Sequence, residues 1–238
     1  MWFLSHHAIE IGLADADKVM SNLGPRKPDI EQDTMGFIST GSKAMDSLMT
    51  NGIPIGRVTE VAGSPGAGKT QLGMQLSVNT VMPEDLGGLN ADVIYIDTEN
   101  SLSALRLKEM MDSWIKENEV INLESQDLVA KIQQITVSDH TELFEFVQDL
   151  HDYLERSKNV RLIVLDSIAF HFRQNFTDMT ERTRILSKMA QTLRNIAYQK
   201  RIAVLITNQM TTKIIKGSET VHWVPALGDS WGHCCTNR

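Results

Sequence analysis

Apolar residues along this chain form two kinds of pattern: short runs rich in β-branched side chains, and longer segments with helical spacing. The runs have strand length. They are Arg57–Val61, Val93–Asp97, Gln133–Val137, Leu162–Asp166 and Ile202–Thr207. The clearest helical segment is Thr183–Lys200, whose apolar positions fall on one face. Because apolar strands alternate with helix-length segments, we expect an α/β fold with a mostly parallel sheet flanked by helices.

The chain divides into a short N-terminal part and one main domain. Residues 1–34 contain a weak helical pattern followed by a polar stretch with two prolines, which predicts a short helix and a linker. The main domain is expected over 35–238. Two of its segments, 169–180 and 211–228, lack periodicity and are too long for simple turns. We expect them to be functional loops, because each follows the carboxyl end of a strand.

Composition excludes several classes of protein. The 238 residues are 42% hydrophobic and 22% charged, which is typical of a globular domain and excludes disordered, collagen-like and disulfide-rich chains. No apolar run approaches the roughly 18 residues that a membrane span needs. The first ten residues lack the pattern of a signal peptide. We therefore expect an intracellular protein without a membrane partner.

Charge is distributed unevenly along the chain. Residues 1–155 hold 10 Lys and Arg against 25 Asp and Glu, net −15, whereas residues 156–238 hold 13 against 5, net +8, which together give −7. A basic surface on an acidic body allows one face to meet phosphates. The alternative is a solvated basic helix face. The two cysteines, Cys234 and Cys235, are adjacent, which favours reduced structural thiols over a disulfide or a zinc site.

A phosphate-binding loop is the strongest motif. Its pattern G-x-x-x-x-G-K-[ST] is matched at every position by Gly63, Ser64, Pro65, Gly66, Ala67, Gly68, Lys69 and Thr70. The loop follows a predicted strand and opens a predicted helix over Thr70–Val81, so its backbone N–H groups face a polyphosphate. Lys69 is expected to reach the β- and γ-phosphates of ATP, and the Thr70 hydroxyl to bind Mg²⁺.

Polar side chains end three other predicted strands. Asp166 closes a buried strand and is placed for a water-mediated contact to the magnesium ion. Asp97 and Glu99 follow a second strand; if that strand neighbours Asp166, Glu99 faces the γ-phosphate and polarises the attacking water. The alternative is that both carboxylates cap the following helix. Gln209 ends a third strand, where its amide can bond the γ-phosphate and signal to the segment that follows.

These motifs together resemble the ATPase core of the RecA-like eukaryotic strand-exchange recombinases. The resemblance covers residues 35–238 and includes Ile206–Lys213 and Pro225–His233. Within that family, Ile168–Arg173 taken with 208–213 and 230–233 is most similar to the recombinase paralogue subfamily lettered C. The resemblance implies a RecA-like P-loop ATPase core.

The family resemblance also assigns roles to residues. Lys69, Thr70 and the adjoining Gln71 would bind ATP and Mg²⁺, with Asp166 supporting the metal, Glu99 as the hydrolytic base and Gln209 as the γ-phosphate sensor. Segments 169–180 and 211–228 would face DNA. The candidate phosphate contacts are Arg173, Arg182, Arg184, Lys213 and Lys216. His222 and Trp223 would stack on bases or, alternatively, pack under their own loop.

The resemblance further implies an accessory subunit in homologous recombination and double-strand break repair. Its partners would be single-stranded and branched DNA, sister paralogues and the main recombinase. Its place would be the nucleus, with some protein in the cytoplasm, and its roles would extend to meiosis. It would be a slow DNA-dependent ATPase. Two alternatives are a nucleotide-locked assembly adaptor with negligible hydrolysis, and an unrelated P-loop NTPase or kinase.

The chain departs from the family pattern in four respects. Asn100 stands where the family usually has glycine, which would reshape the turn that holds Glu99. The N-terminal DNA-binding domain is absent or reduced to 1–34, and no aromatic-x-x-alanine tether is found. The sequence stops at Arg238, where the family continues into further strands. We therefore expect a core truncated at its C-terminus, with one sheet edge unpaired.

Overall fold

The computed structural model describes residues 35–49, 51–173, 176, 178–214 and 221–238. The chain divides into two units, Met1–Met35 and Gly36–Arg238, and the fold described below is that of the second. The predicted N-terminal helix and linker, and the candidate contact Lys216, lie outside the described residues. Within the described ranges, no helix is both long and apolar enough to span a membrane.

Five parallel strands form the main sheet. They lie in the order β3-β7-β6-β4-β5, and all five predicted strands are confirmed. Their bounds are Val58–Gly63 for β3, Asp92–Asp97 for β4, Ile132–Thr136 for β5, Val160–Asp166 for β6 and Ala203–Ile214 for β7. Because all five are parallel, their carboxyl ends lie at one edge of the sheet, which is where such sheets bind ligands.

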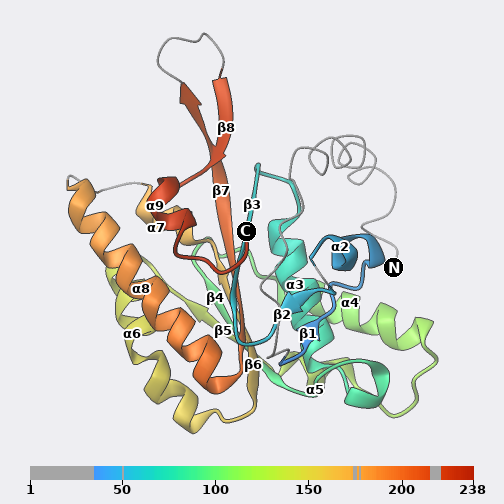
Figure 1. Cartoon of the computed structure of the whole chain (residues 1–238). Helices are drawn as coiled ribbons and strands as arrows, with labels where there is room; N and C mark the ends of the chain where they lie inside the picture. Colours follow the sequence, from blue (N-terminus) through green and yellow to red (C-terminus); the bar gives the residue numbers. More distant parts are fainter. Residues whose placement is uncertain (1–34, 50, 174–175, 177, 215–220) are drawn as a thin grey trace. The chain divides into compact units, whose positions relative to one another are not determined.

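Helices cover both faces of this sheet (Figure 1). Helices α3 (Lys69–Val81), α4 (Ala104–Glu117) and α5 (Ser125–Val129) pack on one face, and α6 (His140–Arg156) and α8 (Met179–Lys200) on the other. Strand β6 contributes to the apolar core on both faces. Leu162 and Val164 pack in the cluster under α3, α4 and α5, whereas Ile163 and Leu165 pack in the cluster under α6 and α8. Burial on two faces explains why these strands are apolar at every position.

Several small elements complete the fold. Strands β1 (Phe37–Ile38) and β2 (Ile53–Pro54) form an antiparallel pair, and they flank α2 (Lys43–Leu48), whose first turn is capped by Ser42. A 3₁₀ turn, η1, spans Glu84–Leu86.

Both cysteines are free, which confirms the prediction of reduced thiols. Burial, and after it the negative charge of Glu60, raises the pKa of Cys235 to about 12, so this thiol is unreactive at neutral pH.

The two segments predicted as loops contain regular elements where the structure describes them, so the prediction of irregular loops is wrong there; residues 174–175, 177 and 215–220 lie outside the described residues. A short helix, α7 (Ile168–Phe172), follows β6 directly. Residues 211–214 continue β7, which forms an antiparallel hairpin with β8 (Val221–Pro225), and α9 (Gly228–Gly232) comes next. The hairpin extends beyond the sheet (Figure 1). The side chains of Thr212, Lys213, His222 and Trp223 on its paired strands are all exposed, so no alternation of buried apolar and exposed polar positions marks it in the sequence.

The prediction that one edge of the sheet is unpaired is wrong in part, because the edge strand β3 has hydrogen-bond partners. Strand β3 lies at the end of the strand order, and the last residues of the sequence run beside it. The Glu60 amide donates to the Asn237 carbonyl over 3.0 Å, and the Thr236 amide donates to the Val58 carbonyl over 2.9 Å. These bonds satisfy backbone groups that an edge strand otherwise leaves unpaired.

Candidate nucleotide site

The phosphate-binding loop joins β3 to α3 and has the geometry that an anion requires. Gly66 and Gly68 have φ angles of +78° and +88°, and a Cβ built on either would meet no atom within 4 Å. The glycines are therefore needed for their backbone conformation, and the space beside them is open. Lys69 Nζ lies inside the loop, where it donates to the carbonyls of Gly63 and Ser64 over 2.9 and 3.0 Å.

These residues fit a Mg²⁺-bound polyphosphate. The start of α3, a helix of 13 residues, directs unpaired N–H groups at the loop, and Lys69 adds a positive charge. The Thr70 hydroxyl makes no hydrogen bond within the described part of the chain, so it remains available for a metal ion. A loop made of donors and one cation suits an anion and no other common ligand class.

Asp166 is held rigidly at the end of β6. It is 3% exposed; its Oδ2 accepts from Tyr95 Oη over 2.9 Å and its Oδ1 from Thr207 Oγ1 over 2.5 Å. Burial, and next the charge of Asp166, raise the pKa of Tyr95, so the phenol stays protonated and donates. A carboxylate accepts up to about four bonds, which leaves capacity for metal-bound water.

Glycine at position 73 brings this carboxylate close to the helix of the phosphate loop. A Cβ at Gly73 would lie 3.0 Å from Tyr95 Oη and 3.2 Å from Val164 Cγ1, which is tighter than ordinary contact. Helix α3 therefore packs directly on the tyrosine that holds Asp166. The Tyr95 side chain therefore lies between α3 and Asp166, the carboxylate predicted to support the metal.

Asp97 stabilises a turn and does not point to a ligand. Its carboxylate accepts from the amides of Glu99, Ser101 and Leu102, and from Gln134 Nε2. The alternative that the carboxylates after β4 cap the following helix does not hold, because Ser103 is the N-cap of α4. Asp97 instead fixes the turn from which Glu99 projects.

Glu99 lies among groups from the ends of two other strands. Its Oε1 accepts from Ser167 Oγ over 2.6 Å and from Gln209 Nε2 over 3.1 Å. The strand register explains this meeting: Asp97 lies opposite Asp166 on β4 and β6, and β6 in turn pairs with β7, the strand of Gln209, with Leu165 opposite Ile206. The strand neighbourhood on which the role of Glu99 depended is therefore present.

Asn100 adopts a backbone conformation that glycine also favours. Its φ is +52°, in the left-handed region. Asparagine enters this region more readily than most residues because its short amide bonds locally. The substitution therefore leaves the turn intact, and Glu99 remains directed towards Ser167 and Gln209.

The described candidate DNA contacts lie on α7, the start of α8 and the hairpin, and two of them are engaged with other groups of the chain. Arg173 donates to Gln209 Oε1 over 2.5 Å, and Arg182 lies with its Nη1 3.5 Å from the Phe172 carbonyl and its Nε buried. Arg184 is exposed on α8, whereas Lys213 lies on the hairpin opposite His222. Their role as phosphate contacts of DNA stays a prediction.

The hairpin carries the most exposed aromatic side chain of this region. Trp223 lies on β8 opposite Thr212 and is 63% exposed. An indole exposed to this degree is not packed beneath its own hairpin. Its ring remains available for contact from outside.

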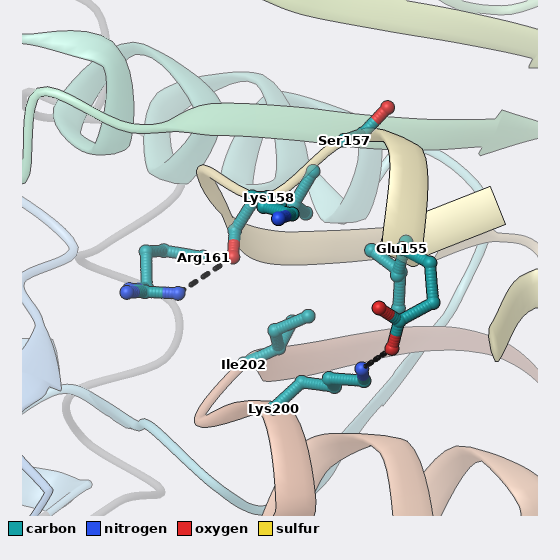
Figure 2. A pocket seen from close by; sticks show the side chains of 8 residues that line it. Glu155, Ser157, Lys158, Arg161, Lys200 and Ile202 are labelled. Atoms are coloured by element: carbon teal, nitrogen blue, oxygen red, sulfur yellow. Dashed lines mark hydrogen bonds and ion pairs between the residues drawn. The ribbon is translucent and has the colours of Figure 1, made fainter. Parts of the chain in front are cut away.

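Other cations of the basic C-terminal third lie at the opposite edge of the sheet. A hollow of about 200 Å³ lies there, lined by Lys158, Arg161 and Lys200 among others, whose side chains are drawn in Figure 2. Lys200 is paired with Glu155, and Arg161 donates to the Val160 carbonyl over 3.2 Å. Because this hollow lies where β6 and β7 begin, it is separate from the edge that holds Asp166 and Gln209.

A buried polar cluster next to the loop was not anticipated from the sequence. Glu60, 2% exposed on β3, accepts from Asn208 Nδ2 over 2.6 Å and Trp231 Nε1 over 3.0 Å, and Arg238 Nε lies 2.7 Å from its other oxygen. Asn208 Nδ2 also donates to the Ala226 carbonyl at the base of the hairpin. The charge at position 60, inside a strand, is the one sequence signal that marks this cluster.

Comparison with known proteins agrees with this geometry. Residues 31–238 match the Rad51 family. The chain is 38% identical over 222 residues to "DNA repair protein RAD51 homolog 3" of Cricetulus griseus, covering 87% of this chain and 60% of that protein. It is 39% identical over 212 residues to the protein of the same name from Dictyostelium discoideum, covering 84% and 56%.

A more distant relative extends the match beyond eukaryotes. "DNA repair and recombination protein RadA" of Metallosphaera sedula is 30% identical over 213 residues, covering 84% of this chain and 64% of that protein. The chain thus spans about three fifths of the length of these relatives. The predicted recombinase resemblance is confirmed, and this chain belongs to the Rad51 family.

Proposed function

We propose that this chain binds ATP with Mg²⁺ at the carboxyl edge of its sheet and acts with DNA as an accessory subunit in homologous recombination. One observation carries the proposal: the phosphate loop, Asp166, Glu99 and Gln209 come from four strands and converge at this edge. The names of the relatives, DNA repair and recombination proteins, support the biological setting.

Each residue of the edge has a chemical task in this proposal. Lys69 and the loop amides bind the β- and γ-phosphates, the Thr70 hydroxyl holds the metal, and Asp166 orients metal-bound water. Mg²⁺, when bound, neutralises charge that develops on the phosphate oxygens. Glu99 has a second oxygen, Oε2, that accepts no bond from the described residues and can accept one from a water molecule.

Single-stranded DNA is the ligand that we assign to the hairpin. Lys213, His222 and the exposed Trp223 lie on its paired strands, and a cation beside an aromatic ring suits a phosphate and a stacked base. Branched DNA, sister paralogues and the main recombinase are the further partners we propose, with the nucleus as the place of action. We propose slow hydrolysis, below about 1 per second.

Substitution of Lys69 by alanine tests nucleotide binding. The change removes the one cation inside the loop and leaves the helix intact, so a fluorescent ATP analogue with Mg²⁺ should bind at least about tenfold more weakly. Lys158→Ala, at the opposite sheet edge, is the matched control and should bind normally. Unchanged affinity in Lys69→Ala would overturn the assignment.

Turnover distinguishes the alternatives. Slow hydrolysis stimulated by DNA supports the ATPase, whereas tight ATP binding with no measurable hydrolysis, with or without DNA, indicates the assembly adaptor. A phosphorylated small molecule formed from ATP would instead indicate a kinase. The experiment measures released phosphate and ADP from the same sample.

A further inference from the structure

Arg173 is joined to the nucleotide edge by a continuous series of hydrogen bonds. The residue is the C-cap of α7, and its Nη1 donates to Gln209 Oε1 over 2.5 Å. Gln209 Nε2 donates to Glu99 Oε1 over 3.1 Å, and Ser167 Oγ donates to the same oxygen over 2.6 Å. A cation predicted from the sequence as a DNA contact therefore acts, in this structure, on the glutamine beside the phosphate loop.

The chemistry of the three groups permits only one orientation of the amide. A guanidinium has donors and no acceptor, and a carboxylate has acceptors and no donor. With its oxygen towards Arg173 and its NH₂ towards Glu99, the Gln209 carboxamide satisfies both neighbours. A rotated amide would place two donors together on one side and two acceptors together on the other.

The strand register gives this orientation a consequence for the nucleotide. Gln209 lies directly opposite Gly63, the first residue of the phosphate loop, and Glu99 lies beyond its NH₂ group. We propose that Arg173 is a positioning residue of the nucleotide site, which fixes the Gln209 carboxamide with its NH₂ towards Glu99 and the γ-phosphate position. This role rests on the proposed function, since the γ-phosphate is what the oriented amide would meet.

A double-mutant cycle tests the role of Arg173 through its selectivity for the γ-phosphate. The quantity measured is the ratio of the Kd for ADP to the Kd for ADP with beryllium fluoride, which places a γ-phosphate mimic in the site. We expect Arg173→Ala to lower this ratio about fivefold to tenfold while the Kd for ADP is unchanged. Arg173→Lys should restore part of the loss, because its ammonium still donates.

The cycle is completed by Gln209→Ala and the double variant. If Arg173 acts through Gln209, Arg173→Ala has no further effect once Gln209 is alanine. Arg156→Ala, an exposed arginine at the end of α6, is the matched control and should leave the ratio unchanged. Melting temperatures of all variants identify any loss of folding.

The outcomes that would overturn the role of Arg173 differ from the outcome that would overturn the proposed function. Additive effects of the two substitutions, or an unchanged ratio in Arg173→Ala, would overturn the role of Arg173 alone. Equal weakening of both nucleotides together with a lower melting temperature would also overturn it, since that indicates a structural role. A wild-type chain that binds neither nucleotide would overturn the proposed function and, with it, this role.

Discussion

Single buried polar residues decide how this site is built. Asp166 is nearly inaccessible, and it accepts from two hydroxyls on neighbouring strands. Buried carboxylates of this kind require their donors, because an unpaired acceptor costs its full desolvation energy. Asn100, with φ of +52°, is the other residue whose conformation the site requires. From the sequence, Asn100 could be recognised only as a departure from the family pattern, and its left-handed conformation could not.

Tyr95→Phe should lower the free energy of unfolding by about 1–3 kcal/mol, because it removes a donor to the buried Asp166. The matched control is Tyr153→Phe, whose hydroxyl donates to the neutral Gln133 amide over 2.7 Å in a partly exposed position. That change should cost about 0.5–1.5 kcal/mol. Urea denaturation of both variants measures the difference. Equal costs would contradict the special role of the Asp166 bond.

At the scale of elements, the apolar pattern of the sequence predicted the strands and helices of the core. It did not predict the elements that are held mainly by backbone hydrogen bonds. The five core strands and the helices over 70–81 and 183–200 follow from burial, which leaves a regular pattern. Strand β8 and the outer half of β7 pair mainly with each other, so hydrogen bonds and not an apolar face hold them. Helix α7 has only five residues, too few for a periodic signal.

Two helix caps make the stability of the fold sensitive to acid. Backbone amides of Glu142 and then Thr141 hold the pKa of Asp139, the cap of α6, below its usual value, and those of Thr180 and Glu181 do the same for Asp178 on α8. A lowered pKa means that the folded state favours the charged form. The stabilisation is therefore present above about pH 4 and is lost as the pH falls below it.

The melting temperature measured between pH 7 and pH 3 tests this pair of caps. In the wild type it should fall at the acid end, and in the double variant Asp139→Asn with Asp178→Asn the decrease should be smaller. Asp149→Asn, an exposed change within α6, is the control and should leave the curve unchanged. Parallel curves for the double variant and the wild type would show that these caps contribute nothing to acid sensitivity.

At the scale of the whole domain, the basic C-terminal third is divided between the two edges of the sheet. Arg184 and Lys213 lie towards the nucleotide edge and the hairpin, whereas Lys158, Arg161 and Lys200 line the hollow at the other edge. Counting charges along the sequence could not separate these groups, because the separation arises only when the strands align. Binding of a polyanion should therefore depend on where a cation lies, and not only on net charge.

Charge reversal at the two edges tests this division. Arg184→Glu with Lys213→Glu should weaken single-stranded DNA of any sequence and reduce the slope of log K against log salt by about 1.4, at roughly 0.7 for each lost contact. Arg156→Glu with Lys158→Glu changes the net charge equally at the opposite edge and should have little effect. Equal losses in the two double variants would show that only net charge matters.

Strand β7 joins the proposed ATP site to the hairpin proposed to contact DNA, since its residues run from Ala203 beside the loop strand to Ile214 in the hairpin. The most direct test is fluorescence anisotropy of labelled single-stranded DNA at fixed salt, with and without Mg²⁺ and a slowly hydrolysed ATP analogue. We expect the nucleotide to tighten DNA binding in the wild type and to have no effect in Lys69→Ala. DNA affinity that is independent of nucleotide in both proteins would contradict the account.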